Sequence, residues 1–189
     1  EKKNALEAAG EGKVIFSYEE SYGYMLGDYV RDKDAVTASM LLTEMAAWYA
    51  AQGMTLFDAL NALYEKYGYY AEKTHNLVMP GLDGLRDMAE LMRKLKDEPP
   101  TEIAGTEVVV RKDYNDGTVH DCRTGAVTKM ELSGSNVLRF ELADGTTILA
   151  RPSGTEPKIK VYILARGKDA VDAAANVEKY GAWAEALKG

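Results

Sequence analysis

The chain has 189 residues, enough for one large domain or two small ones, and 46% of them are hydrophobic and 28% charged, as in ordinary globular proteins. Its formal net charge of −7 argues against a nucleic-acid-binding surface, and no apolar run approaches the roughly 20 residues of a membrane span. A single cysteine, Cys122, excludes a disulfide within the chain and favours a reducing, cytoplasmic location.

The first seventy residues predict one short strand followed by two helices. The apolar run in KVIFSY indicates a strand over 13–18, and the glycine-containing stretch 19–29 indicates a loop. Asp34 suits the N-cap of a helix that continues to about residue 51. Thr55, with Asp58 three residues later, suits the start of a second helix that Gly68 ends. Helical spacing predicts a buried apolar face on each helix, formed by Val36, Met40, Met45 and Trp48 on the first and by Leu56, Leu60, Leu63 and Tyr64 on the second.

The remaining residues predict a sheet of short antiparallel strands flanked by helices. A strand over 72–81 precedes a helix that Asp83 begins, and the chain ends in a helix over about 169–187. The helix after Asp83 is expected to turn Leu85, Met88, Met92 and Leu95 inward. Between the helices, turn signals such as NDG and ADG separate strand-like runs at 107–114, 126–132, 136–142, 146–151 and 158–165.

This order of elements indicates two units with a boundary near residue 72. The first unit, with one clear strand in about 70 residues, is too small to complete a doubly wound sheet. The chain also begins at Glu1 without a methionine. We therefore expect it to be part of a longer protein.

The stretch RPSGTEPKIKVY, at 151–162, has the composition of an oxyanion site. Arg151 offers a fork of donors that fits phosphate, and Ser153 and Thr155 add hydroxyl donors. Gly154 is expected to let the backbone turn tightly and direct amide groups at one point, and Lys158 adds a positive charge. An ordinary hairpin turn is the alternative, and Glu156 counts against an anion site.

A second polar loop follows the first predicted strand. Glu19 and Ser21 are two residues apart, so in an extended loop they face the same side. A carboxylate and a hydroxyl together suit sugar hydroxyls, which both donate and accept hydrogen bonds. The alternative is a solvated polar loop without a ligand.

Together the two loops suit a phosphosugar, and they resemble the sugar-binding and phosphate-binding loops of the α-D-phosphohexomutases. FSYEESYGY at 16–24, RDKDAVTASMLLTEM at 31–45 and RPSGTEPKIKVY at 151–162 carry the resemblance, which is nearest to the phosphoglucomutase and phosphomannomutase branch. It implies α/β and α+β architecture. We expect the C-terminal part of the family's third domain, α/β, over 1–71, and its fourth domain, α+β with a TATA-binding-protein-like fold, over 72–189.

The resemblance also implies an isomerase that moves phosphate between the 1 and 6 positions of a hexose, with a hexose 1,6-bisphosphate as intermediate and activator. Glu19 and Ser21 match the family's sugar contacts. The phosphate ligands match Arg151, Ser153, Gly154 and Thr155, and Lys158 is a weaker match.

The family's phosphorylated serine and its Mg²⁺ loop have no counterpart in this sequence. KTHN at 73–76 carries a threonine in place of the serine, and Asp32 and Asp34 resemble a helix start more than a metal cage. We therefore expect no catalytic residue here, Mg²⁺ ligands outside this chain, and no turnover by the chain alone. The expected partners are a phosphosugar and the other domains of the enzyme, without nucleic acid or membrane.

Two other interpretations stay open at this point. The chain could be a stand-alone phosphosugar-binding or regulatory module without catalysis, or both loops could be plain turns of an assembly domain. The sequence does not fix whether the sugar is glucose, mannose or another one, nor the oligomeric state.

Overall fold

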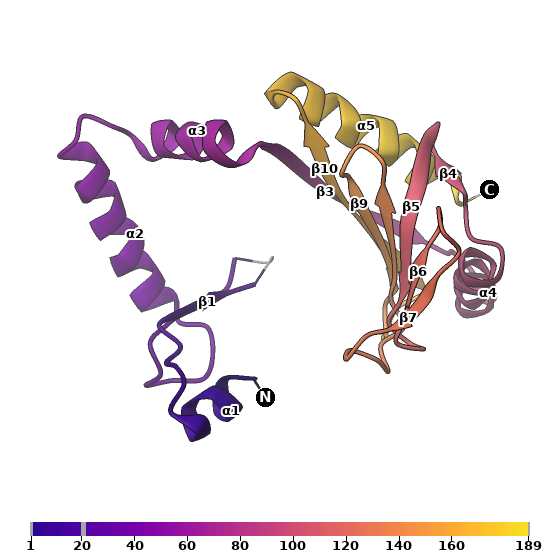
Figure 1. The fold of residues 1–189 in the computed structure, drawn as a ribbon, viewed down its shortest axis with the longest axis horizontal. Coiled ribbons are helices and arrows are strands. Elements are labelled where there is room, and N and C mark those ends of the chain that lie inside the picture. The colour runs from indigo at the N-terminus through magenta and orange to yellow at the C-terminus, as the bar shows by residue number, and fades with distance from the viewer. Residues whose placement is uncertain (1, 20–21, 189) are drawn as a thin grey trace. The chain divides into compact units, whose positions relative to one another are not determined.

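The computed structural model describes residues 2–19 and 22–188, and the chain divides into two compact units, 1–63 and 64–189 (Figure 1). Each unit is described by itself. Among the described residues, no helix is both long and apolar enough to cross a membrane.

The N-terminal unit begins with a helix, α1 (Lys2–Ala9), that the sequence pattern did not predict. A hairpin of two short strands follows, β1 (Phe16–Tyr18) and β2 (Tyr24–Leu26). The strand predicted over 13–18 thus starts at Phe16, and the prediction of a loop over 19–29 is wrong where β2 forms. Residues 24–26 pair antiparallel with β1, Phe16 lying opposite Leu26, and the stacked rings of Phe16 and Tyr24 add an aromatic contact.

Both predicted helices of this unit are present, as α2 (Ala35–Ala50) and α3 (Leu56–Tyr67), with the expected caps. The Asp34 carboxylate accepts the Val36 amide. Thr55 and Asp58 form a reciprocal capping box, in which the Thr55 amide donates to the Asp58 carboxylate and the Asp58 amide to the Thr55 hydroxyl. Gly68, at φ 104°, ends α3 in the left-handed region that favours glycine.

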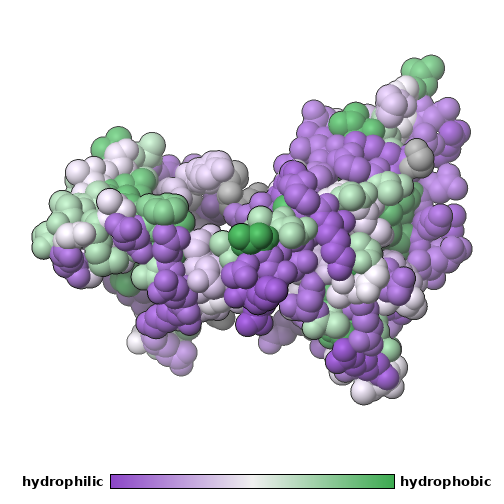
Figure 2. All heavy atoms as spheres, turned by 90° about the horizontal axis from the view of Figure 1, so that it is seen from above, coloured by the Kyte–Doolittle hydropathy of each residue, from purple (hydrophilic) through white to green (hydrophobic). Residues whose placement is uncertain are grey.

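The prediction of a buried apolar face on these two helices is wrong for the described chain. No residue of α2 is buried, and Val36 and Trp48 are 76% and 61% exposed. Ala59 is the one buried residue of α3. Apolar side chains on the surface of this unit are visible in the space-filling view (Figure 2). Helix α2 is apolar without a distinct apolar face and α3 is amphipathic, and burial of either needs a partner surface that the described residues do not supply.

The C-terminal unit is an eight-stranded antiparallel sheet with two helices. Its strand order is β3-β10-β9-β8-β5-β6-β7, with β4 paired to β5. The strands are β3 (Tyr69–Val78), β4 (Glu102–Ile103), β5 (Thr106–Asp113), β6 (Thr118–Asp121), β7 (Val127–Lys129), β8 (Leu138–Leu142), β9 (Thr147–Pro152) and β10 (Lys158–Gly167).

Two helices cover one face of this sheet, α4 (Gly84–Asp97) and α5 (Ala170–Ala186). Helix α5 packs along β3 and β10 (Figure 1). The alternation predicted for β10 is confirmed, since Ile159, Val161 and Ile163 are fully buried on the helix-covered face. The opposite, open face carries Lys158, Lys160 and Tyr162.

Several details of this unit differ from the sequence-based expectation. The sequence pattern missed β6, because its residues follow a turn signal and do not alternate in hydrophobicity. Leu85 is 62% exposed, although Met92 and Leu95 are buried as predicted. Asp83 precedes α4 without a side-chain cap bond and forms an ion pair with Arg86 instead, at 3.1 Å.

Candidate functional site

The candidate phosphate loop connects β9 to β10, two adjacent strands inside the sheet. Arg151 and Pro152 are the last residues of β9, and Lys158 is the first of β10. The hairpin register sets Arg151 directly opposite Lys160. Sheet pairing therefore brings both cations to the open face, next to the connecting loop 153–157.

Ser153 organises the loop itself. Its hydroxyl oxygen lies 3.4 Å from the Thr155 amide nitrogen and 3.3 Å from that of Glu156, and its own amide donates to the Lys158 carbonyl at 2.8 Å. This is the local hydroxyl-to-backbone turn that serine favours. The Ser153 hydroxyl proton stays available to a ligand.

Gly154 does not make the turn in the way the sequence predicted. Its φ lies outside the left-handed region, so another residue could adopt this backbone conformation. A Cβ at this position would meet no heavy atom within 4 Å. Within the described chain the Gly154 amide has no hydrogen-bond acceptor. The glycine therefore leaves an exposed backbone donor that a ligand can approach closely.

Among the residues that the structure describes, neither Arg151 nor Lys160 forms an ion pair, although the Glu156 carboxylate interacts with Lys160 without a direct contact. Like charges directly opposite on neighbouring strands repel each other, so this pair attracts an anion. Sequence reasoning did not include Lys160 in the site. The alternation of β10 predicted that Lys160 shares a face with Lys158, but its place opposite Arg151 is given by the hairpin register alone.

The only carboxylate in the loop is held by the neighbouring lysine. Glu156 pairs with Lys158, which lowers the pKa of Glu156, and Lys160 adds to this effect. Glu156 thereby keeps its charge and partly neutralises Lys158. Of the predicted phosphate ligands, Lys158 is thus the one with an internal counter-charge.

The far end of the loop is anchored to the start of α4. The Met79 amide donates to the Pro157 carbonyl at 2.8 Å. Gly84, the first residue of α4, lies so close that a Cβ there would be 2.2 Å from the Met79 carbonyl oxygen and 3.0 Å from the Pro157 Cβ. Only glycine fits this contact without displacing the backbone.

The second predicted loop lies at the tip of the β1–β2 hairpin in the N-terminal unit. The Glu19 amide donates to the Gly23 carbonyl at 2.9 Å, and the Glu19 carboxylate lies 3.4 Å from the Lys33 Nζ. Ser21 lies outside the described residues. Gly23 is packed against Lys33 and Glu19, since a Cβ would lie 2.3 Å from the Lys33 Cδ and 2.5 Å from a Glu19 carboxylate oxygen.

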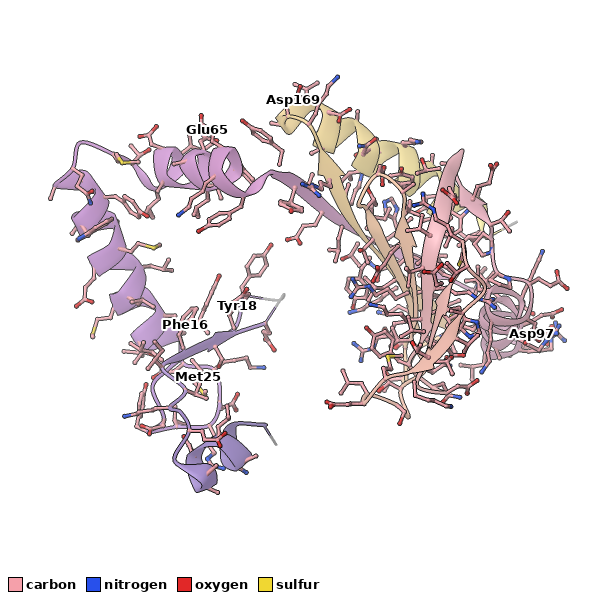
Figure 3. All side chains as sticks on the ribbon, in the orientation of Figure 1. Phe16, Tyr18, Met25, Glu65, Asp97 and Asp169 are labelled. Atoms are coloured by element: carbon pink, nitrogen blue, oxygen red, sulfur yellow. The ribbon has the colours of Figure 1, made fainter. Side chains whose placement is uncertain are left out.

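A small open pocket of about 270 Å³ adjoins Glu19. Its walls come from the hairpin and from the segment before α2. Figure 3 shows Tyr18 and Met25 projecting from this hairpin. A carboxylate, a lysine and a phenol around one hollow can accept and donate hydrogen bonds to a polyhydroxylated ligand. The lining residues are Ser17, Tyr18, Glu19, Gly23, Met25, Asp32 and Lys33.

The described residues do not fit a magnesium site. Asp34 is committed to capping α2 and accepts the Tyr29 hydroxyl, and Asp32 accepts the Lys33 amide at 2.7 Å. No group of three or more His, Cys, Asp or Glu in the described part of the chain could hold a metal ion.

Two family models match the chain. One is described as phosphoglucomutase/phosphomannomutase, alpha/beta/alpha domain III, and matches residues 2–67. The other is described as phosphoglucomutase/phosphomannomutase, C-terminal domain, and matches residues 76–178. Between them they include both candidate loops.

Curated relatives are similar over most of the chain. A phosphoglucomutase of Staphylococcus aureus strain N315 is 35% identical over 164 residues, which are 87% of this chain and 30% of the relative. A phosphoglucomutase of Staphylococcus haemolyticus is 37% identical over 149 residues, 79% of this chain and 27% of the relative. The chain thus spans less than a third of the length of these relatives.

A solved structure shares the fold. The open form of the exocytosis-sensitive phosphoprotein pp63/parafusin, a phosphoglucomutase from Paramecium, matches with a TM-score of 0.60 and 20% sequence identity. The match covers 97% of this chain and 32% of that chain.

Proposed function

The chain belongs to the phosphoglucomutase/phosphomannomutase family, a family of isomerases, and on this premise we propose that it is the substrate-holding part of a phosphohexomutase. In the enzyme, phosphate moves between the 1 and 6 positions of a hexose through a hexose 1,6-bisphosphate. The sugar must present either end to the reacting centre, so one loop has to hold whichever phosphate is not reacting.

The observation that carries this proposal is the Arg151–Lys160 pair beside loop 153–157. Two cations without an ion pair lie opposite each other on β9 and β10, and the loop that joins these strands holds a serine hydroxyl and the free Gly154 amide. Together they supply charge, directed donors and close backbone approach, which are the three requirements of a phosphate site. We assign phosphate binding to Arg151, Ser153, Gly154 and Thr155, with Lys158 contributing less.

At the other loop we propose that Glu19 and Ser21 contact sugar hydroxyls. The pocket beside Glu19 supports this assignment, because its lining offers both acceptors and donors. In this proposal residues 1–71 belong to the family's third domain and 72–189 to its fourth. Mg²⁺ and the phosphorylated serine belong to other domains of the same cytoplasmic enzyme, so this chain alone binds the phosphosugar without turning it over.

The test is an NMR titration of the 189-residue chain with glucose 1-phosphate, glucose 6-phosphate, inorganic phosphate and unphosphorylated glucose. We expect saturable shifts at residues 151–160 with the three phosphate compounds and not with glucose. Additional shifts around 17–23 with the sugar phosphates alone would support the sugar assignment. Absence of saturable shifts at 151–160 with millimolar ligand would overturn the proposal.

A further inference from the structure

A second arginine without an acid lies on the other face of the sheet. Arg111, on β5, is opposite His120 on β6 and opposite Phe140 on β8. Phe140 is 2% exposed and belongs to the core under the helices, whereas Arg151 lies on the open face. Arg111 is therefore separated from the phosphate loop by the sheet itself.

Among the described residues, the one hydrogen-bond partner of the Arg111 guanidinium is a histidine ring. Its Nη2 lies 3.2 Å from the His120 Nδ1, and both side chains are half-buried. A guanidinium can only donate, so Nδ1 is the acceptor and the proton of the neutral ring is on Nε2. His120 thus satisfies one donor of Arg111 without supplying a negative charge.

Two cavities adjoin this pair, with volumes of about 210 and 450 Å³. Arg111 and His120 line both of them. Pro99, after the end of α4, also lies in both walls, and Leu95 and Phe140 give the smaller cavity an apolar side. A small molecule can therefore reach the arginine and remain partly shielded from water.

Each carboxylate that lines these cavities already has a partner. Lys96 binds both Asp113, at 2.9 Å, and Asp116, at 2.7 Å. Asp97, labelled at the end of α4 in Figure 3, pairs with Arg93 at 3.3 Å. On the other side Glu107 pairs with Arg123, and Asp121 accepts the amides of Arg123 and Thr124. Arg111 is the cation of this region that lacks an acid within the described chain.

The positive charge of Arg111 affects the pKa values of the neighbouring His120 and Cys122 side chains. Burial lowers the pKa of His120, Arg111 lowers it further, and the opposing effect of Asp113 is smaller. Burial raises the pKa of the Cys122 thiol, and among the charges that act on it Arg111 has the largest effect. Among the charges that act on these two side chains, Arg111 thus has the largest effect on both.

We propose that Arg111 and His120 form a second anion-binding site, which takes a small oxyanion of the phosphate or carboxylate type. The guanidinium fork binds two oxygens of the anion, and the cavities on either side accommodate the rest of the ligand. A half-buried charge without a counter-charge is costly, and a bound oxyanion removes that cost. Because this site lies across the sheet from the phosphate loop, it would bind an effector or a second ligand.

The proposal is tested by following the His120 ring and Arg111 side-chain NMR signals of the 189-residue chain. Inorganic phosphate and acetate are added separately at constant ionic strength. We expect saturable shifts with at least one anion, and the effective anion identifies the ligand class. Arg111→Gln should weaken this binding about tenfold or more, and Arg111→Lys, which keeps the charge but loses the fork, should weaken it less.

Two control variants separate this site from others. Arg86→Gln removes an exposed arginine that pairs with Asp83 and Asp87 and lines neither cavity, and Arg151→Gln removes the arginine of the candidate phosphate loop. Neither substitution should change the anion-induced shift of the His120 ring signals. Loss of phosphate binding at the loop would therefore leave this shift intact, whereas absence of a site at Arg111 would leave no shift. The proposal is overturned if the unaltered chain gives no saturable His120 shift with either anion, or if Arg86→Gln weakens the response as much as Arg111→Gln.

Discussion

Arg151 and Lys160 stand opposite each other because of the register of one hairpin. Neither cation by itself indicates a binding site, since single cations are common on protein surfaces. Their pairing next to the Ser153 turn and the free Gly154 amide gives the loop its chemistry. The one acid in the loop, Glu156, is held by Lys158.

Replacing that acid should strengthen phosphate binding. In Glu156→Gln the negative charge beside the site is lost and Lys158 is released, so we expect inorganic phosphate to bind a few-fold more tightly. Calorimetry on the variant and the unaltered chain measures this. Glu178→Gln, which breaks a comparable exposed pair with Lys73, is the matched control and should bind as the unaltered chain does. Weaker binding by Glu156→Gln would contradict this account of the loop.

The sequence predicted some, but not all, of the residues that form the candidate phosphate site. Arg151, Ser153 and Thr155 could be named because arginine and hydroxyl donors around a glycine are typical of anion loops. Lys160 could not be named with them, since its membership depends on which residue β9 places opposite it. The role expected of Gly154 was also inexact, because Ser153 makes the turn and Gly154 leaves the backbone open.

Among the helices and strands, α4 contacts the phosphate loop through its first residue. Gly84 fits under the Met79 carbonyl and Pro157, so α4 sets the position of the phosphate loop. Gly84→Ala should destabilise the unit by about 1–3 kcal/mol through overpacking and should also weaken phosphate binding. Denaturant unfolding and a phosphate titration measure the two effects.

Gly181→Ala is the matched control for this prediction. Gly181 lies in α5, and a Cβ there would be 2.7 Å from the His75 Nε2, away from the phosphate loop. We expect it to lower stability while leaving phosphate affinity unchanged at temperatures where the variant is folded. Equal phosphate affinity for the Gly84 and Gly181 variants would show that α4 does not position the loop.

Helix α5 is fixed to the sheet by a buried phenol whose ionisation links stability to pH. Tyr180 donates to Asp144 and lies 2.9 Å from the Thr106 hydroxyl, and burial, with the Asp144 bond, raises the pKa of Tyr180 from 10.0 to about 12. A folded-state pKa above the unfolded value means that the neutral phenol stabilises the fold below pH 10. This contribution is lost as the pH rises from 10 towards 12.

The corresponding measurement is the free energy of unfolding in urea from neutral pH to pH 12. Tyr180→Phe should be less stable at neutral pH, by about 1–3 kcal/mol for the lost hydrogen bonds, and should lose less stability above pH 10. Tyr162→Phe, on the open face of β10, serves as the comparison and should follow the unaltered chain. A Tyr180→Phe profile parallel to that of the unaltered chain would refute the link.

Element prediction succeeded where local signals were strong. Asp34, Thr55 and Gly68 mark helix ends through their own side-chain or backbone chemistry, and the structure has the helices there. The strands β2 and β6 were missed because a three- or four-residue strand is defined by its partner more than by its own pattern.

For the molecule as a whole, the two units differ in how much they bury. The hydrophobic core of the described residues begins at Leu77 and lies within the C-terminal unit, whereas Ala59 is the one buried apolar residue of the N-terminal unit. The exposed apolar side chains of α2 and α3 explain the difference. They need a further surface, which in our proposal other domains of the enzyme supply, and sequence periodicity cannot tell whether that surface is present.

This difference predicts different folding behaviour of the two units. Residues 64–189 expressed alone should unfold cooperatively on heating, because they keep the whole of this core. Residues 1–63 should show no cooperative transition and should bind a hydrophobic dye. Circular dichroism and dye fluorescence measure both, and a cooperative transition in residues 1–63 would contradict our view of this unit.

In our proposal, the hairpin loop after β9 holds the phosphate of a phosphosugar. The most direct measurement is the affinity of the 189-residue chain for glucose 1-phosphate, compared with the variants Arg151→Ala and Arg123→Ala at equal ionic strength. We expect saturable binding that Arg151→Ala weakens by about 1.5–3 kcal/mol and Arg123→Ala leaves unchanged. Absence of saturable binding, or an affinity that Arg151→Ala does not alter, would contradict it.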